Sequence, residues 1–110
     1  MDERFQQLYE LLYSPIITPY NLLENAKLDN YDYVNYSKIE NGMLVTMKCT
    51  IERDLIANFF YFFDDNDCLQ MVKMETDEGM ETIFDRQSEI EKLKERIQLN
   101  NKESFTSIAI

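Results

Sequence analysis

The chain has 110 residues and contains no histidine and no tryptophan, with only two glycines, two prolines and two cysteines. Without histidine, a single subunit cannot form the Cys-His or Ser-His pairs of the common nucleophilic enzymes. Both glycines stand at expected turns, so no glycine-rich loop is left to hold a phosphate group. We therefore expect no enzyme here, and no catalytic residue, metal site or cofactor.

The sequence also lacks a signal for export or membrane insertion. No apolar run approaches the ~20 residues that span a bilayer. The first residues, Met1 to Arg4, are acidic and no apolar region follows them, unlike a signal peptide. The predicted strands place Cys49 and Cys68 beyond the ~7 Å limit for a disulfide. We therefore expect reduced cysteines and a cytoplasmic location.

Positive charge is scarce. The chain has 21 acidic and 11 basic residues, a formal net charge of −10 and a pI near 4.3. Such a surface repels phosphate backbones, which disfavours direct binding to nucleic acid. Two interpretations stay open. The acidity can serve solubility alone, or it can speed docking on a basic protein partner, including a partner whose nucleic-acid groove the chain would occupy.

The residues that are present predict a meander of four antiparallel strands. Asn41-Gly42 is typical of a two-residue hairpin turn. Apolar and polar residues alternate over 43–52, the period of a half-buried strand. A third strand is expected over 55–63, after a two-residue turn at Arg53-Asp54. The acidic run Asp64 to Asp67 ends it, and a fourth strand follows over 68–74.

Helices are expected before and after these strands along the chain. An N-terminal pair is indicated by Phe5, Leu8, Tyr9 and Leu12 at helical spacing, and by a second start at Thr18-Pro19. After Asp77 to Gly79, a long final helix is predicted from the spacing of Ile83, Phe84, Ile90, Leu93 and Ile97. We expect these helices to dock on the sheet. Residues 102–110 are open to three interpretations: an edge strand, a packed tail or a flexible end.

The expected register gives the sheet two apolar faces. With the second turn at Arg53-Asp54, Met47 lies opposite Phe60. The core face then carries Val45, Met47, Ile51, Ile56, Phe60, Phe62, Leu69 and Met71. The other face carries Leu44, Phe59, Tyr61, Phe63, Val72 and Met74. A half-exposed antiparallel sheet is normally polar on its outer face. Either a helix covers this second face, or the face binds a partner or a second copy as a homodimer.

One α+β domain over residues 1–110 is therefore predicted, with a function in protein binding. The candidate partner-binding residues are Leu44, Phe59, Tyr61, Phe63, Val72, Asp64, Asp65 and Asp67. The chain resembles bacterial and phage inhibitor, immunity and adaptor proteins as a class, because it is small, acidic and without a catalytic, metal or nucleotide motif. The alternative is a small-molecule pocket between the sheet and a helix, lined by Tyr36, Phe59 and Tyr61 with Asn58 as a polar contact.

Overall fold

The computed structural model describes residues 3–109, and side chains over 3–99. Its elements are α1 (Glu3–Tyr13), η1 (Pro19–Lys27), β1 (Tyr31–Ile39), β2 (Gly42–Thr50), η2 (Glu52–Asp54), β3 (Ile56–Asp64), β4 (Leu69–Thr76), β5 (Gly79–Asp85) and α2 (Arg86–Ala109), where η marks a 3-10 helix. The backbone of α2 includes residues 102–109, and Ile110 lies outside the described residues. The predicted α+β class with an antiparallel sheet and a C-terminal helix is confirmed.

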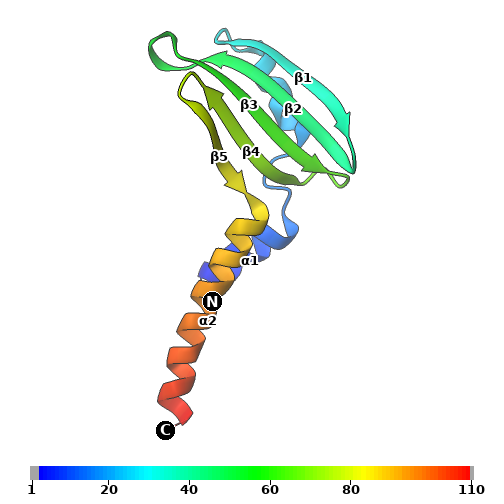
Figure 1. Ribbon diagram of the computed structural model, residues 1–110. Coiled ribbons are helices and arrows are strands. Elements are labelled where there is room, and N and C mark those ends of the chain that lie inside the picture. Colours follow the sequence, from blue (N-terminus) through cyan, green and yellow to red (C-terminus); the bar gives the residue numbers. More distant parts are fainter. Residues whose placement is uncertain (1–2, 110) are drawn as a thin grey trace.

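The molecule has two parts (Figure 1). We call residues 19–85, which hold η1 and the five strands, the sheet lobe, and we call the pair α1 and α2 the stalk. The radius of gyration is 18.1 Å, whereas a compact chain of this length has about 13 Å. The cause is α2, whose 24 residues extend about 36 Å at 1.5 Å per residue.

The sheet is a meander of five antiparallel strands in the order β1-β2-β3-β4-β5. The expected hairpin at Asn41-Gly42 is confirmed, although its loop is Glu40 and Asn41, because Ile39 pairs with Gly42. Asn41 takes the positive φ of 63°. Gly42 is needed for a different reason: a Cβ there would lie 1.9 Å from the carbonyl oxygen of Phe63 on β3.

The predicted register between β2 and β3 is wrong by one residue. The connection is a five-residue loop, closed by a 2.7 Å hydrogen bond from the Ile51 amide to the Leu55 carbonyl. Both Arg53 and Asp54 lie in this loop with positive φ. Met47 therefore pairs with Phe59 and not with Phe60. A shift of one residue exchanges the two faces of β3 relative to β2.

The strand β5 was expected to be the start of the final helix. Thr76 pairs with Gly79 across a tight turn at Asp77 and Glu78, and Gly79 has a φ of 123°. The register then shifts between Val72 and Lys73. This bulge breaks the two-residue period of β5, so that its apolar residues imitate helical spacing.

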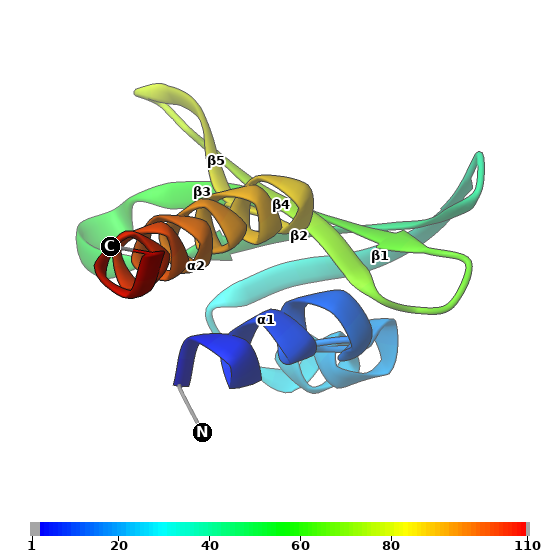
Figure 2. The ribbon, with the colours of Figure 1, turned by 90° about the horizontal axis from the view of Figure 1, so that it is seen from below.

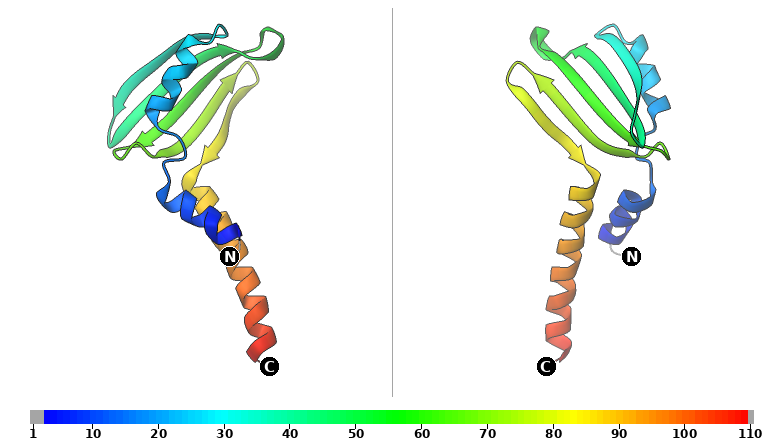
Figure 3. Two further views of the ribbon diagram at one scale, coloured as in Figure 1. Left: turned by 180° about the vertical axis from the view of Figure 1, so that it is seen from behind. Right: turned by 45° about the vertical axis from the view of Figure 1, so that its right-hand side comes forward.

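The two N-terminal helical segments separate. Only η1 lies over the sheet, whereas α1 packs beside α2 (Figures 2 and 3). The expected start of η1 is confirmed, with Pro19 in its first turn and the Thr18 amide donating to Asn21 Oδ1 at 2.8 Å. Leu22 of η1 is buried in the core cluster. The Tyr36 hydroxyl on β1 donates to the Pro19 carbonyl at 2.9 Å, which ties η1 to the sheet edge.

The final helix does not dock across the sheet, which contradicts the expectation. Its first residue, Arg86, is 5% exposed. Arg86 Nε donates to the Leu69 carbonyl at 2.6 Å, Nη2 donates to the Pro15 carbonyl at 3.1 Å, and Nη1 donates to the Leu11 carbonyl. These contacts hold the start of α2 against the end of α1, so α2 leaves the sheet (Figure 1).

The close approach of Gly42 to Phe63 predicts that two substitutions in this turn change the free energy of unfolding by different amounts. Gly42→Asn should lower the free energy of unfolding by about 2 kcal/mol or more, because the strands must separate to admit the side chain. Asn41→Gly should change it by less than about 1 kcal/mol, since glycine adopts positive φ freely. Urea unfolding followed by circular dichroism measures both. Equal losses in the two variants would contradict the close contact with Phe63 as the reason that position 42 requires glycine.

The Arg86 contacts predict a large loss of stability in Arg86→Met. The buried Leu69 carbonyl and the partly buried Leu11 and Pro15 contacts lose a charged donor, which we expect to cost roughly 3 kcal/mol in urea unfolding. Arg86→Lys should fall between this variant and wild type, because an ammonium group does not reproduce the fork of the guanidinium. The control is Arg96→Met, at an exposed position of the same helix. Similar losses for both methionine variants would contradict the assignment.

Candidate protein-binding surface

The two faces of the sheet differ in what lies over them. The covered face packs under η1 and includes Val34, Val45, Met47, Cys49, Phe59, Tyr61, Phe63, Leu69 and Val72. The bare face includes Leu44, Thr46, Lys48, Asn58, Phe60, Phe62, Met71 and Lys73. No helix among the described residues lies over the bare face (Figures 1 and 3).

The bare face is apolar at its centre. One row across the strands runs from Leu44 through Phe62 to Met71, and Phe60 lies in the next row between Thr46 and Lys73. The four apolar side chains are partly exposed. A third row runs from Lys48 through Asn58 to Glu75. Lys48 Nζ lies 3.9 Å from Asp32 Oδ2 in an exposed ion pair, which contributes little to stability. The centre therefore offers apolar surface, and its border offers polar groups.

The predicted partner-binding residues divide between the two faces. Leu44 lies on the bare face, while Phe59, Tyr61, Phe63 and Val72 lie on the covered face. Phe63 and Val72 are 2% and 5% exposed, so both belong to the core. The expectation that the five share one surface is wrong, because of the register. The same error placed Phe60, Phe62 and Met71 in the core, and the structure brings these three together with Leu44.

The acidic turn after β3 has a structural basis. Asp64 Oδ1 accepts hydrogen bonds from the Asn66 amide at 2.9 Å and the Cys68 amide at 3.0 Å, and Asp64 Oδ2 accepts one from Gln70 Nε2 at 3.0 Å. This carboxylate is therefore engaged in holding the turn. Asp65 is exposed, and Asp67 is partly buried. Within residues 3–109, no group of three acidic or cysteine side chains is arranged to hold a metal ion.

The expected small-molecule pocket is not assembled as predicted. Asn58 lies on the bare face, one residue out of phase with Phe59 and Tyr61 on the covered face. Tyr36 instead lines a separate hollow of about 260 Å³ beside η1, with Pro19, Tyr20, Leu23, Met43 and Asp67. Tyr36, Phe59 and Tyr61 therefore share the covered face, whereas Asn58, the predicted polar contact, lies on the bare face.

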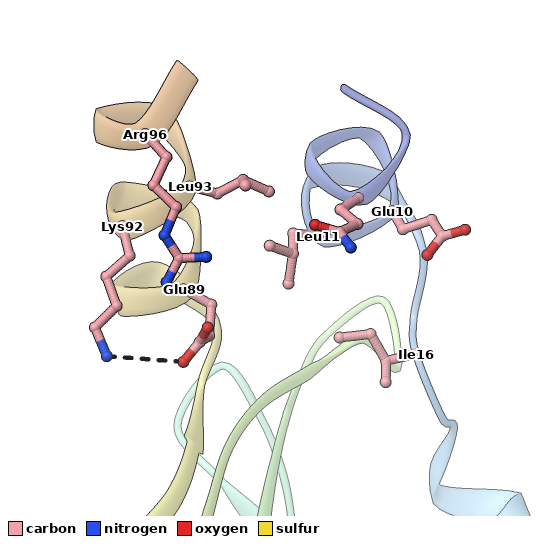
Figure 4. A pocket seen from close by; sticks show the side chains of 8 residues that line it. Glu10, Leu11, Ile16, Glu89, Lys92, Leu93 and Arg96 are labelled. Carbon is pink, nitrogen blue, oxygen red and sulfur yellow. Dashed lines mark ion pairs between the residues drawn. The ribbon is translucent and has the colours of Figure 1, made fainter. Parts of the chain in front are cut away.

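A second hollow lies in the stalk, where α1 meets α2 (Figure 4). Its volume is about 360 Å³, and its lining is Gln7, Glu10, Leu11, Ile16, Glu89, Lys92, Leu93 and Arg96. Leu11 and Leu93 face each other between the helices. The Lys92 ammonium lies 3.9 Å from Glu89 Oε1. The groove carries both signs of charge, so its rim does not select an anion or a cation.

Both cysteines are free thiols, which confirms the prediction that they do not form a disulfide. Cys49 is 2% exposed on the covered face, where it pairs across strands with Tyr31. Burial raises the pKa of the Cys49 thiol. Burial also raises the pKa of Tyr31, and the neighbouring Cys49 adds to that rise. These groups stay neutral at physiological pH and act as core residues.

Comparison of the chain with protein-family models, with curated proteins and with solved structures finds no match in any of the three. Over the described residues, no helix combines the length and the apolar character that crossing a bilayer requires.

The different surroundings of the two cysteines predict different reactivity. With an aromatic disulfide reagent at pH 8, one thiol of the native protein should react quickly, that of the partly exposed Cys68, and the reagent releases one aromatic thiolate for each cysteine that reacts. Cys49 should react at least about tenfold more slowly, because it is buried and its raised pKa leaves less thiolate at any given pH. Cys68→Ser should remove the fast phase, and urea should expose both thiols. A fast phase that survives in Cys68→Ser would contradict the burial of Cys49.

Proposed function

We propose that this chain is a small, acidic, non-catalytic protein-binding module, of the inhibitor, immunity or adaptor kind, and that it binds its partner with the bare face. The observation that carries the proposal is the apolar row of Leu44, Phe62 and Met71, with Phe60 beside it, on a face that no helix within residues 3–109 covers. An antiparallel sheet that meets water is normally polar on that side.

The chemistry of the row suits a protein surface. Phenylalanine and methionine are enriched at the centres of protein interfaces, with polar residues around them. The bare face has this arrangement, because Thr46, Lys48, Asn58 and Lys73 border the apolar row. Burial of each apolar side chain by a partner contributes up to about 1.5–3 kcal/mol, less what the side chain already buries. Four such residues are enough to anchor a complex.

The charge of the sheet lobe indicates the kind of partner. Residues 14–85, which are the sheet lobe and the linker before it, contain fourteen acidic and five basic side chains, a net charge of −9. A partner with an apolar centre and a basic periphery would be steered toward this lobe. Asp65 in the turn after β3 is exposed and contributes to this field. The association rate with such a partner should therefore fall as salt increases.

The proposal predicts that a charge placed on the bare face weakens binding of the partner, whereas the same charge placed on η1 does not. Leu44→Glu places a charge at the apolar row, whereas Leu23→Glu makes the same change on η1, at a side chain that is 51% exposed. A partner is first captured from the source cells and identified by mass spectrometry. Titration calorimetry with the purified partner should then show at least about tenfold weaker binding for Leu44→Glu.

Leu23→Glu should bind within about twofold of wild type, because it is remote from the bare face. Equal affinity of both variants would contradict the proposed surface. Loss of binding in Leu23→Glu alone would move the site to η1. If the captured molecule proves to be a small ligand bound near Tyr36, the pocket alternative replaces the proposal.

A further inference from the structure

The helix α1 has more apolar surface than α2 can cover. Phe5, Tyr9, Leu12 and Tyr13 are spaced i, i+4, i+7 and i+8, so they form one stripe along α1. We call it the α1 stripe. Its members are 46%, 62%, 42% and 68% exposed, in that order. Leu8 and Leu11, on the adjoining arc of the helix, are only partly exposed.

The α1 stripe is an organised surface of the stalk. Tyr9 and Tyr13 have ring centroids 4.9 Å apart, so the two side chains already pack on each other. No charged residue belongs to the stripe. We propose that the α1 stripe is the contact between two copies of this chain, which pair through their stalks as a two-fold dimer.

The exposed area of the stripe suits a small dimer interface. At about 200 Å² for each large side chain, the exposed fractions correspond to roughly 400 Å² of surface on one helix, most of it apolar apart from the two tyrosine hydroxyls. That is as large as the greatest apolar patch of a typical monomer. A specific interface of the smallest class buries about 600 Å² on each partner. The stripe supplies most of this area.

The distribution of charge favours the stalk over the sheet as the place where two copies meet. The sheet lobe with its linker, residues 14–85, carries −9. The remaining segments, 1–13 and 86–110, carry seven acidic and six basic residues, which gives −1. Pairing through the bare faces would bring two strongly negative lobes together, whereas pairing through the α1 stripes would keep them apart.

A two-fold contact is also compatible with the shape of the stalk. In such a dimer the same stripe serves on both copies, so one apolar surface is complementary to itself. The result is four helices, with the two α1 helices at the centre and an α2 on the outside of each. One α1 and one α2, which pack beside each other at the start of α2 (Figure 3), would form half of this row of four helices. The bare faces stay free for the proposed protein partner, so this inference does not depend on that function.

Sedimentation equilibrium of the full chain between 2 and 200 µM tests the dimer. Wild type should fit a monomer–dimer equilibrium, and Tyr9→Glu should raise its dissociation constant at least tenfold. Tyr20→Glu is the matched control, since Tyr20 on η1 is 69% exposed and receives the same change. Leu44→Glu tests the bare face. Both of these variants should dimerise like wild type.

A monomeric wild type at 200 µM would overturn the proposal, as would a Tyr9→Glu variant that dimerises normally. Loss of the dimer in Leu44→Glu alone would assign the contact to the sheet. If Tyr9→Glu loses helix content by circular dichroism, Tyr13→Lys replaces it. The chain has no tryptophan, so Tyr9→Trp adds a single reporter. Its emission should shift to shorter wavelength as concentration rises, and an emission that is independent of concentration would also overturn the proposal.

Discussion

The guanidinium of Arg86 is buried where the end of α1, the following linker, the start of β4 and the start of α2 meet. It reaches the carbonyls of Leu11, Pro15 and Leu69, which belong to three different segments. The Leu69 amide in turn donates to the Pro15 carbonyl at 3.1 Å. A buried charge without partners would be very unfavourable, so the three segments must come together around the arginine. This single side chain therefore fixes how the stalk joins the sheet.

That junction also explains why the bare face is bare. Asp85 ends β5, and its carboxylate caps α2 by accepting from the Ser88 amide at 3.2 Å. With α2 capped there and held by Arg86, the helix points away from the strands, and α1 follows it. Of the helices that the structure describes, only η1 covers the sheet. One apolar face is closed by Leu22 and its neighbours, and the other face keeps its phenylalanines in contact with water.

Local sequence signals predicted much of the fold, because they depend on neighbouring residues. The turn near Asn41, the start of η1 and four of the five strands are of this kind. The faces of the sheet could not be assigned in this way, since residues 55–63 are mostly apolar on both sides and burial alone does not choose between them. The choice depends on the number of residues in the loop at Arg53. Of the bare face, only Leu44 was identified from the sequence. The course of α2 depends on Arg86, whose partners are 17 to 75 residues away.

The strand β5 passes into α2 without an intervening residue, since Asp85 ends one and Arg86 begins the other. A flexible linker would let the sheet lobe turn freely about the stalk. The capped and buried junction instead fixes the orientation of the stalk relative to the sheet lobe. Two copies joined through their stalks would hold their bare faces at a set spacing, and a partner that repeats its own binding site at that spacing would gain avidity. A partner with a single site would gain none, so the stalk would select for repeated or oligomeric targets.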